Sequence, residues 1–147
     1  MRLLLVAMGP SIPGDGLLAG VQALRAAGHR VELVSRRAPS PRLSAELDAR
    51  TPLPGPRVQL PGIRAGKLRI DPDRLPGAWR LARHPSTREA VTTAEVLVAV
   101  DQAAIPAVWW AARRRARRGR PPLAALSGVP AAQNRFTLPP ACSCPVV

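Results

Sequence analysis

The apolar residues of this chain form short continuous runs that alternate with helically spaced sets. Residues 3–8 are apolar throughout, which is typical of a parallel strand that is covered on both faces. After a loop that contains glycines, the next apolar residues fall at helical spacing, at Leu17, Leu18, Val21 and Leu24. We expect Gly28 to cap this helix and residues 31–35 to form a second strand. The whole segment has the size of a βαβ unit.

The middle of the chain has a weaker pattern. Residues 43–49 predict a short helix. Prolines and glycines recur through residues 51–77, so we expect an irregular connection there, with a brief strand at residues 58–60. Ser86 then lies three residues before Glu89, which is the spacing of a capping box and predicts the start of another short helix.

The alternation of elements returns in the second half. Residues 96–100 predict a buried strand that ends at Asp101, and residues 104–118 predict a helix. Residues 123–126 are suited to one more strand. Residues 127–147 have no periodicity, and we expect an irregular or disordered tail.

Together these elements predict an α/β fold. We expect a Rossmann-like, mostly parallel sheet of four or five strands over residues 1–126, with helices on both faces and an incomplete C-terminal end. The length of 147 residues suits one domain. Aromatic residues make up only 3% of the chain, so the core must consist of leucine, valine and alanine.

Charge adds the expectation of an anionic partner. The formal net charge is +13, and every basic residue except Lys67 is an arginine. The basic cluster Arg113–Arg120 follows the predicted helix, where the helix dipole favours cations. It is either a solvated helix end or a contact for nucleic acid or an acidic surface. The adjacent Trp109 and Trp110 point about 100° apart, so we expect at least one of them in the core.

The sequence indicates a cytoplasmic protein without a membrane span. Cys142 and Cys144 lie too close together to staple a fold, which favours a reducing compartment, and they are too few to hold a metal. Residues 96–112 are the longest apolar stretch, but they are shorter than the ~20 residues of a span. Asp101 near the middle would cost about 3 kcal/mol in a bilayer.

The glycine loop departs from both common phosphate-binding motifs. Gly9 and Gly14 have P-loop spacing, but Asp15 stands where lysine is required. Gly14, Gly16 and Gly20 are one residue too widely spaced for a dinucleotide fingerprint. The alternative interpretation is structural: Gly14 and Gly16 permit a tight turn, and Gly20 lets the helix approach the sheet.

Charged residues follow three of the predicted strands. In a parallel sheet, ligands bind beyond the carboxyl ends of the strands. Asp15, Arg36 and Asp101 would then share one edge. Arg36 and Arg37 could meet the 2′-phosphate of NADP, or form a solvated strand end. Asp101 could contact a substrate, or cap the following helix. No catalytic motif accompanies them.

The opening "MRLLLVAMGPSIPGDGLLAGVQALRAAGHRVELVS" resembles the start of GT-B glycosyltransferases, and "AEVLVAVDQAAIPAVWWAARR" resembles a late strand and helix of their N-terminal domain. The resemblance implies the acceptor-side half of an enzyme that transfers a sugar from a nucleotide-sugar donor. The donor would be held by a C-terminal domain that this chain lacks, through truncation or a frameshift. We therefore expect no cofactor in this chain and no activity of the chain alone.

The resemblance places no catalytic residue. By position it implies weak substrate contacts from Gly14, Asp15, Gly16 and Asp101. Two other functions remain open at this point: a basic module that binds nucleic acid, and an NADP-binding Rossmann protein.

Overall fold

The computed structural model describes residues 1–53, 81, 84–122 and 124–136. Within them, five strands form one sheet in the order β3-β2-β1-β4-β5, and every neighbouring pair is parallel. The strands are β1 (Arg2–Ala7), β2 (Arg30–Ser35), β3 (Ala49–Pro52), β4 (Val96–Ala99) and β5 (Ala124–Ser127). The expected α/β, Rossmann-like fold is confirmed.

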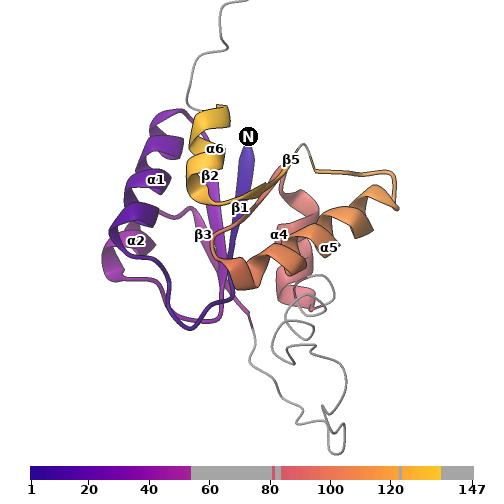
Figure 1. Cartoon of the computed structure of the whole chain (residues 1–147), viewed down its shortest axis with the longest axis horizontal. Coiled ribbons are helices and arrows are strands. Elements are labelled where there is room, and N and C mark those ends of the chain that lie inside the picture. The colour runs from indigo at the N-terminus through magenta and orange to yellow at the C-terminus, as the bar shows by residue number, and fades with distance from the viewer. Residues whose placement is uncertain (54–80, 82–83, 123, 137–147) are drawn as a thin grey trace, which may run out of the picture.

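Helices cover both faces of this sheet (Figure 1). One face carries α1 (Asp15–Ala26), α2 (Pro41–Ala45) and α6 (Val129–Phe136). The other carries α4 (Pro85–Thr93) and α5 (Ile105–Ala116). Leu3 and Leu5 of β1 are buried under α1, α2 and α6, whereas Leu4 and Val6 are buried under α4 and α5. This alternation explains why the whole strand is apolar, since each of its faces is buried.

The βαβ unit has the predicted form. Helix α1 ends in a Schellman motif, in which the N–H of His29 bonds to the carbonyl of Leu24 and the N–H of Gly28 to that of Arg25. Gly28 has φ +79°, a conformation that favours glycine. The expected cap is therefore confirmed, and it turns the chain directly into β2.

The middle of the chain differs from expectation. The helix predicted for residues 43–49 is shorter and earlier, since α2 ends at Ala45. The irregular connection predicted from residue 51 is wrong at its start, because Thr51 and Pro52 belong to β3 and pair with Val34 and Ser35 of β2. An edge strand with exposed residues has no apolar run to reveal it. The strand proposed at residues 58–60 lies outside the described residues.

The start of α4 also differs. His84 is the N-cap residue, and its Nδ1 accepts a hydrogen bond from the N–H of Ser86 at 3.3 Å. Ser86 therefore lies within the first turn, and the Ser86–Glu89 capping box is wrong. The predicted helix itself is present.

The C-terminal part of the described chain has more secondary structure than predicted. The expectation of an irregular tail is wrong for Val129–Phe136, which form α6. Val129 and Ala132 are buried between α6 and α1. Gly20 permits this packing, because a Cβ atom there would clash with Cγ1 of Val129. The close neighbour of Gly20 is thus a helix, and not the sheet as predicted.

None of the helices in the described part of the chain has the length and apolarity of a membrane span.

Candidate functional site

The order of the strands defines the candidate site. From β1 the chain proceeds outward through β2 to β3, and then crosses to the opposite side of β1 to form β4 and β5. The carboxyl ends of β1 and β4 therefore flank the point where the strand order reverses. In open α/β sheets this is the usual position of a ligand. The loop that follows β1 and the loop that begins at Asp101 meet there, at the lower side of the sheet in Figure 1.

Asp101 joins these two loops through its carboxylate. Its Oδ2 accepts hydrogen bonds from the backbone N–H groups of Met8, at 2.8 Å, and Gly9, at 2.9 Å. Its Oδ1 accepts one from the N–H of Ala104, at 2.8 Å. Asp101 is thus the N-cap of the short 3-10 helix η1 (Gln102–Ala104), as one of the two interpretations of the sequence predicted. The two hydrogen bonds from Met8 and Gly9 to Asp101, which we call the clamp, were not predicted.

Gly9 leaves room for this carboxylate. A Cβ atom at residue 9 would lie 3.3 Å from Oδ2 of Asp101, which is tighter than almost all real Cβ contacts. The sequence pattern indicated for Gly9 only the spacing of a P-loop that lacks its lysine. The available signal was a glycine at the end of one strand and an aspartate at the end of another, and only the strand order shows that the two are neighbours.

The clamp has a chemical consequence for anions. Backbone N–H groups at the end of β1 are the donors that would cradle a phosphate in this position. Here two of them already bond to a carboxylate, which would also repel a phosphate. Asp15 places a second carboxylate in the first turn of α1, where it complements the helix dipole. The structure agrees with the departure of the sequence from both phosphate motifs.

Neither a positive φ nor a close neighbour requires glycine at residues 14 and 16. Neither residue has a positive φ. Nothing lies within 4 Å of the position where a Cβ atom would stand at either one. Both glycines are exposed, so their backbone is open to close approach by a ligand.

The other predicted charges lie at the same edge but are not joined to the clamp. Asp15 is exposed and makes no hydrogen bond or ion pair with the rest of the described chain. Arg36 and Arg37 follow β2 and are exposed, while the buried Ser35 donates from its Oγ to the carbonyl of Arg37 at 2.7 Å. The two arginines fit a solvated strand end. An NADP site would also need the phosphate cradle that Asp101 occupies.

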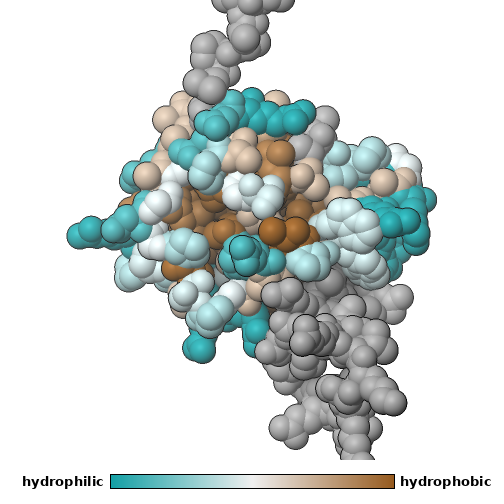
Figure 2. Space-filling view, viewed as in Figure 1, coloured by the Kyte–Doolittle hydropathy of each residue, from teal (hydrophilic) through white to brown (hydrophobic). Residues whose placement is uncertain are grey.

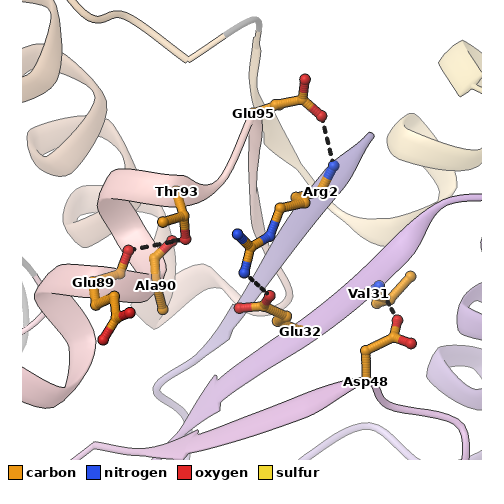
Figure 3. Close-up of polar contacts among 8 residues, drawn as sticks. All are labelled: Arg2, Val31, Glu32, Asp48, Glu89, Ala90, Thr93 and Glu95. Carbon is orange, nitrogen blue, oxygen red and sulfur yellow. Dashed lines mark hydrogen bonds and ion pairs between the residues drawn. The ribbon is translucent and has the colours of Figure 1, made fainter.

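The opposite edge of the sheet holds a polar network (Figure 3). The guanidinium of Arg2 donates to Oε1 of Glu32 at 2.7 Å, and the backbone N–H of Arg2 donates to Glu95 at 2.7 Å. The hydrogen bond to Glu32, and then its charge, raise the pKa of Arg2 above its ordinary value. Asp48 accepts from the N–H of Val31 at 2.7 Å. These contacts join β1 to β2 and to the residue before β4, so we interpret this edge as structural, although Nε of Arg2 is buried without a hydrogen-bond partner.

The basic cluster Arg113–Arg120 divides into different roles. Arg115 donates to the carbonyl of Ala94, which ends α4, and burial lowers the pKa of Arg115. The guanidinium of Arg113 lies 5.1 Å from the ring centroid of Trp109. Trp110 is half-buried and packs against the core, as predicted for one of the two tryptophans. Trp109 is 55% exposed.

The histidines are structural where they are described. The Nε2–H of His29 donates to the carbonyl of Phe136 at 3.2 Å, which joins the turn between α1 and β2 to the end of α6. His84 caps α4. The described residues contain no cluster of three histidine, cysteine, aspartate or glutamate side chains that would hold a metal.

No protein-family model, no curated protein and no solved structure matches this chain. The function is therefore inferred from the geometry at the carboxyl edge of the sheet.

Proposed function

We propose that this chain is the acceptor-side domain of a glycosyltransferase-like enzyme, and that the carboxyl edge at β1 and β4 binds the acceptor. The observation that carries the proposal is the bonding of Asp101. Its carboxylate accepts hydrogen bonds from the N–H groups of Met8 and Gly9, which would otherwise be the donors to a phosphate. These groups lie at the position where Rossmann-like sheets bind ligands. Such an edge favours a neutral ligand rich in hydroxyl groups.

The remaining hydrogen-bonding capacity at this edge suits hydroxyl donors. A carboxylate has about four acceptor positions. The bonds from Met8, Gly9 and Ala104 use three of those on Asp101, and the residue is partly exposed. Asp15 offers a second, exposed carboxylate on the loop side. Hydroxyl groups donate to carboxylates in short, charge-assisted bonds, and the open backbone at Gly14 and Gly16 lets a sugar ring approach.

The same carboxylates disfavour the donor. A nucleotide sugar carries a diphosphate, which Asp15 and Asp101 would repel. In this proposal the donor is held by other residues of a complete enzyme, as the resemblance of the sequence to GT-B enzymes implies. The described chain positions the acceptor and does not by itself transfer a sugar.

The experiment is a binding comparison with matched carboxylate variants. Saturation-transfer NMR on the purified chain would use simple sugars and small polyphenols as acceptor probes, with uridine diphosphate as the donor probe. We expect weak binding of acceptor probes, and a loss of at least threefold in affinity for Asp15→Asn. Glu89→Gln removes an exposed carboxylate on α4 and should leave that affinity unchanged.

Two results would contradict the proposal. One is binding of uridine diphosphate at the glycine loop with no binding of any hydroxyl-bearing probe. The other is measurable sugar transfer by the isolated 147-residue chain.

A further inference from the structure

The outer face of α5 carries exposed apolar residues next to arginines. Ile105 is 40% exposed and Trp109 is 55% exposed. Ile105, Trp109 and Arg113 follow one another at intervals of four residues, so they lie on one side of the helix. This side of α5 therefore presents two exposed apolar side chains beside a cation, with the guanidinium of Arg113 close to the ring of Trp109.

The tryptophans and arginines of this face form a groove. Its volume is about 460 Å³, and its lining comes from Trp109, Trp110, Arg113, Arg114 and Arg117. The guanidinium of Arg113 lies over the ring of Trp109, and that of Arg114 lies 5.5 Å from the ring centroid of Trp110. Planar cations and aromatic rings thus lie side by side, and both kinds of plane stack on nucleobases.

Several cations of this surface form no ion pair within the described part of the chain. The ion pairs between described residues include none of Arg113, Arg117, Arg118 and Arg120. Figure 2 shows hydrophilic side chains gathered over the end of α5, at the right-hand edge of the view. Arg115 differs from these four arginines, since it bonds to the carbonyl of Ala94. The net charge of +13 has the same sign as this surface.

The groove lies away from the proposed acceptor site. Helix α5 begins next to Asp101 at the carboxyl edge and runs away from it (Figure 1). Arg115 reaches Ala94, which precedes β4 and therefore lies at the amino edge. The groove and the acceptor site can therefore be tested separately, and a negative result for one does not affect the other.

We propose that the groove formed by Trp109, Trp110, Arg113, Arg114 and Arg117 binds single-stranded nucleic acid, with a base stacked on Trp109 and phosphates paired with Arg113 and Arg117. A single strand is favoured because its bases are free to stack, whereas a duplex hides them. A membrane surface fits less well. A helix in the interface of a bilayer needs a broad apolar face, and the buried Ala107, Val108 and Ala111 of α5 face the core.

The test measures fluorescence anisotropy of a labelled 15-mer oligothymidylate with the full chain at low salt. Trp109→Ala should weaken binding about tenfold or more, because it removes a stacked base. Trp109→Phe keeps a ring and should stay within about threefold of the parent chain. Arg117→Ala should reduce the slope of log K against log salt by about 0.7, the value for one phosphate contact on a single strand. Circular dichroism melting would verify that each variant is folded.

The matched control separates the groove from overall charge. The double variant Arg36→Ala/Arg37→Ala removes two exposed cations at the other edge of the fold, and should bind the oligonucleotide within about threefold of the parent. Arg113→Ala/Arg117→Ala removes the same charge and should bind much more weakly. Four results would overturn the proposal: no binding, equal affinity of Trp109→Ala and the parent, equal losses for the two double variants, or binding to phosphatidylserine vesicles but not to the oligonucleotide.

Discussion

The carboxylate of Asp101 accepts a hydrogen bond at 2.9 Å from the backbone N–H of Gly9, a residue 92 positions earlier in the chain. This contact joins the carboxyl ends of β1 and β4 at the point where the strand order reverses. It satisfies the amides after β1 internally and places a negative charge where many Rossmann-like proteins place a phosphate. The proposed preference for a hydroxyl-bearing ligand follows from it.

Removing this carboxylate should destabilise the fold. In Asp101→Ala, the N–H groups of Met8, Gly9 and Ala104 lose their common acceptor. We expect the free energy of unfolding to fall by about 2–4 kcal/mol, measured by urea denaturation. Asp15→Ala is the control, since Asp15 is exposed and should contribute less than about 1 kcal/mol through the helix dipole. Equal stability of the two variants would show that the clamp is not formed in solution.

The contact between α1 and α6 makes a second prediction. Gly20→Ala should lower the free energy of unfolding by about 1–3 kcal/mol, because the new methyl group meets Val129. The double variant Gly20→Ala/Val129→Ala should recover part of this loss in a thermal melt, since the smaller side chain makes room. Gly16→Ala, which meets nothing within 4 Å, should be neutral or stabilise α1 by up to about 1 kcal/mol. Losses of equal size at residues 16 and 20 would contradict the packing of α6 on α1.

Arg115 and Arg118 should behave differently although both belong to the basic cluster. Arg115→Ala removes the bond to the carbonyl of Ala94 and the 3.1 Å bond from Nε to the carbonyl of Arg120. We expect a loss of about 1–2 kcal/mol in the free energy of unfolding. Arg118 is exposed, and Arg118→Ala should change stability by less than about 0.5 kcal/mol. If urea denaturation gave the same free energy of unfolding for both variants, the hydrogen bonds of Arg115 would not stabilise the fold.

Local sequence pattern was sufficient for the central strands and for the helix whose apolar residues lie on one side. The strands β1 and β4 are short apolar runs, and α1 has apolar residues at helical spacing, so the pattern predicted each of them. Local sequence pattern did not predict β3, because an edge strand with exposed residues has no apolar run. It also failed for α6, whose buried positions are a valine and an alanine among polar residues and therefore give a weak signal.

The candidate site shows the same limit. The cap formed by Asp101 was one of the two interpretations of the sequence, because capping is local and depends on the next few residues. It could not pair Asp101 with Gly9, since that contact depends on which strands are neighbours. Likewise Trp109 and Arg113 were visible in the sequence, but the exposure of the ring beside the guanidinium depends on which side of α5 faces the core.

The most direct test of the proposed acceptor site is a titration followed by the backbone amide signals of Met8, Gly9, Gly14 and Gly16 in two-dimensional NMR. Inorganic phosphate, uridine diphosphate and NADPH should leave the signals of Met8 and Gly9 unchanged, because Asp101 holds both N–H groups. Hydroxyl-bearing acceptor probes should shift the signals of Gly14 and Gly16. The proposed acceptor site would be contradicted if phosphate or NADPH caused saturable shifts of the Met8 and Gly9 signals while no hydroxyl-bearing probe shifted any of these signals.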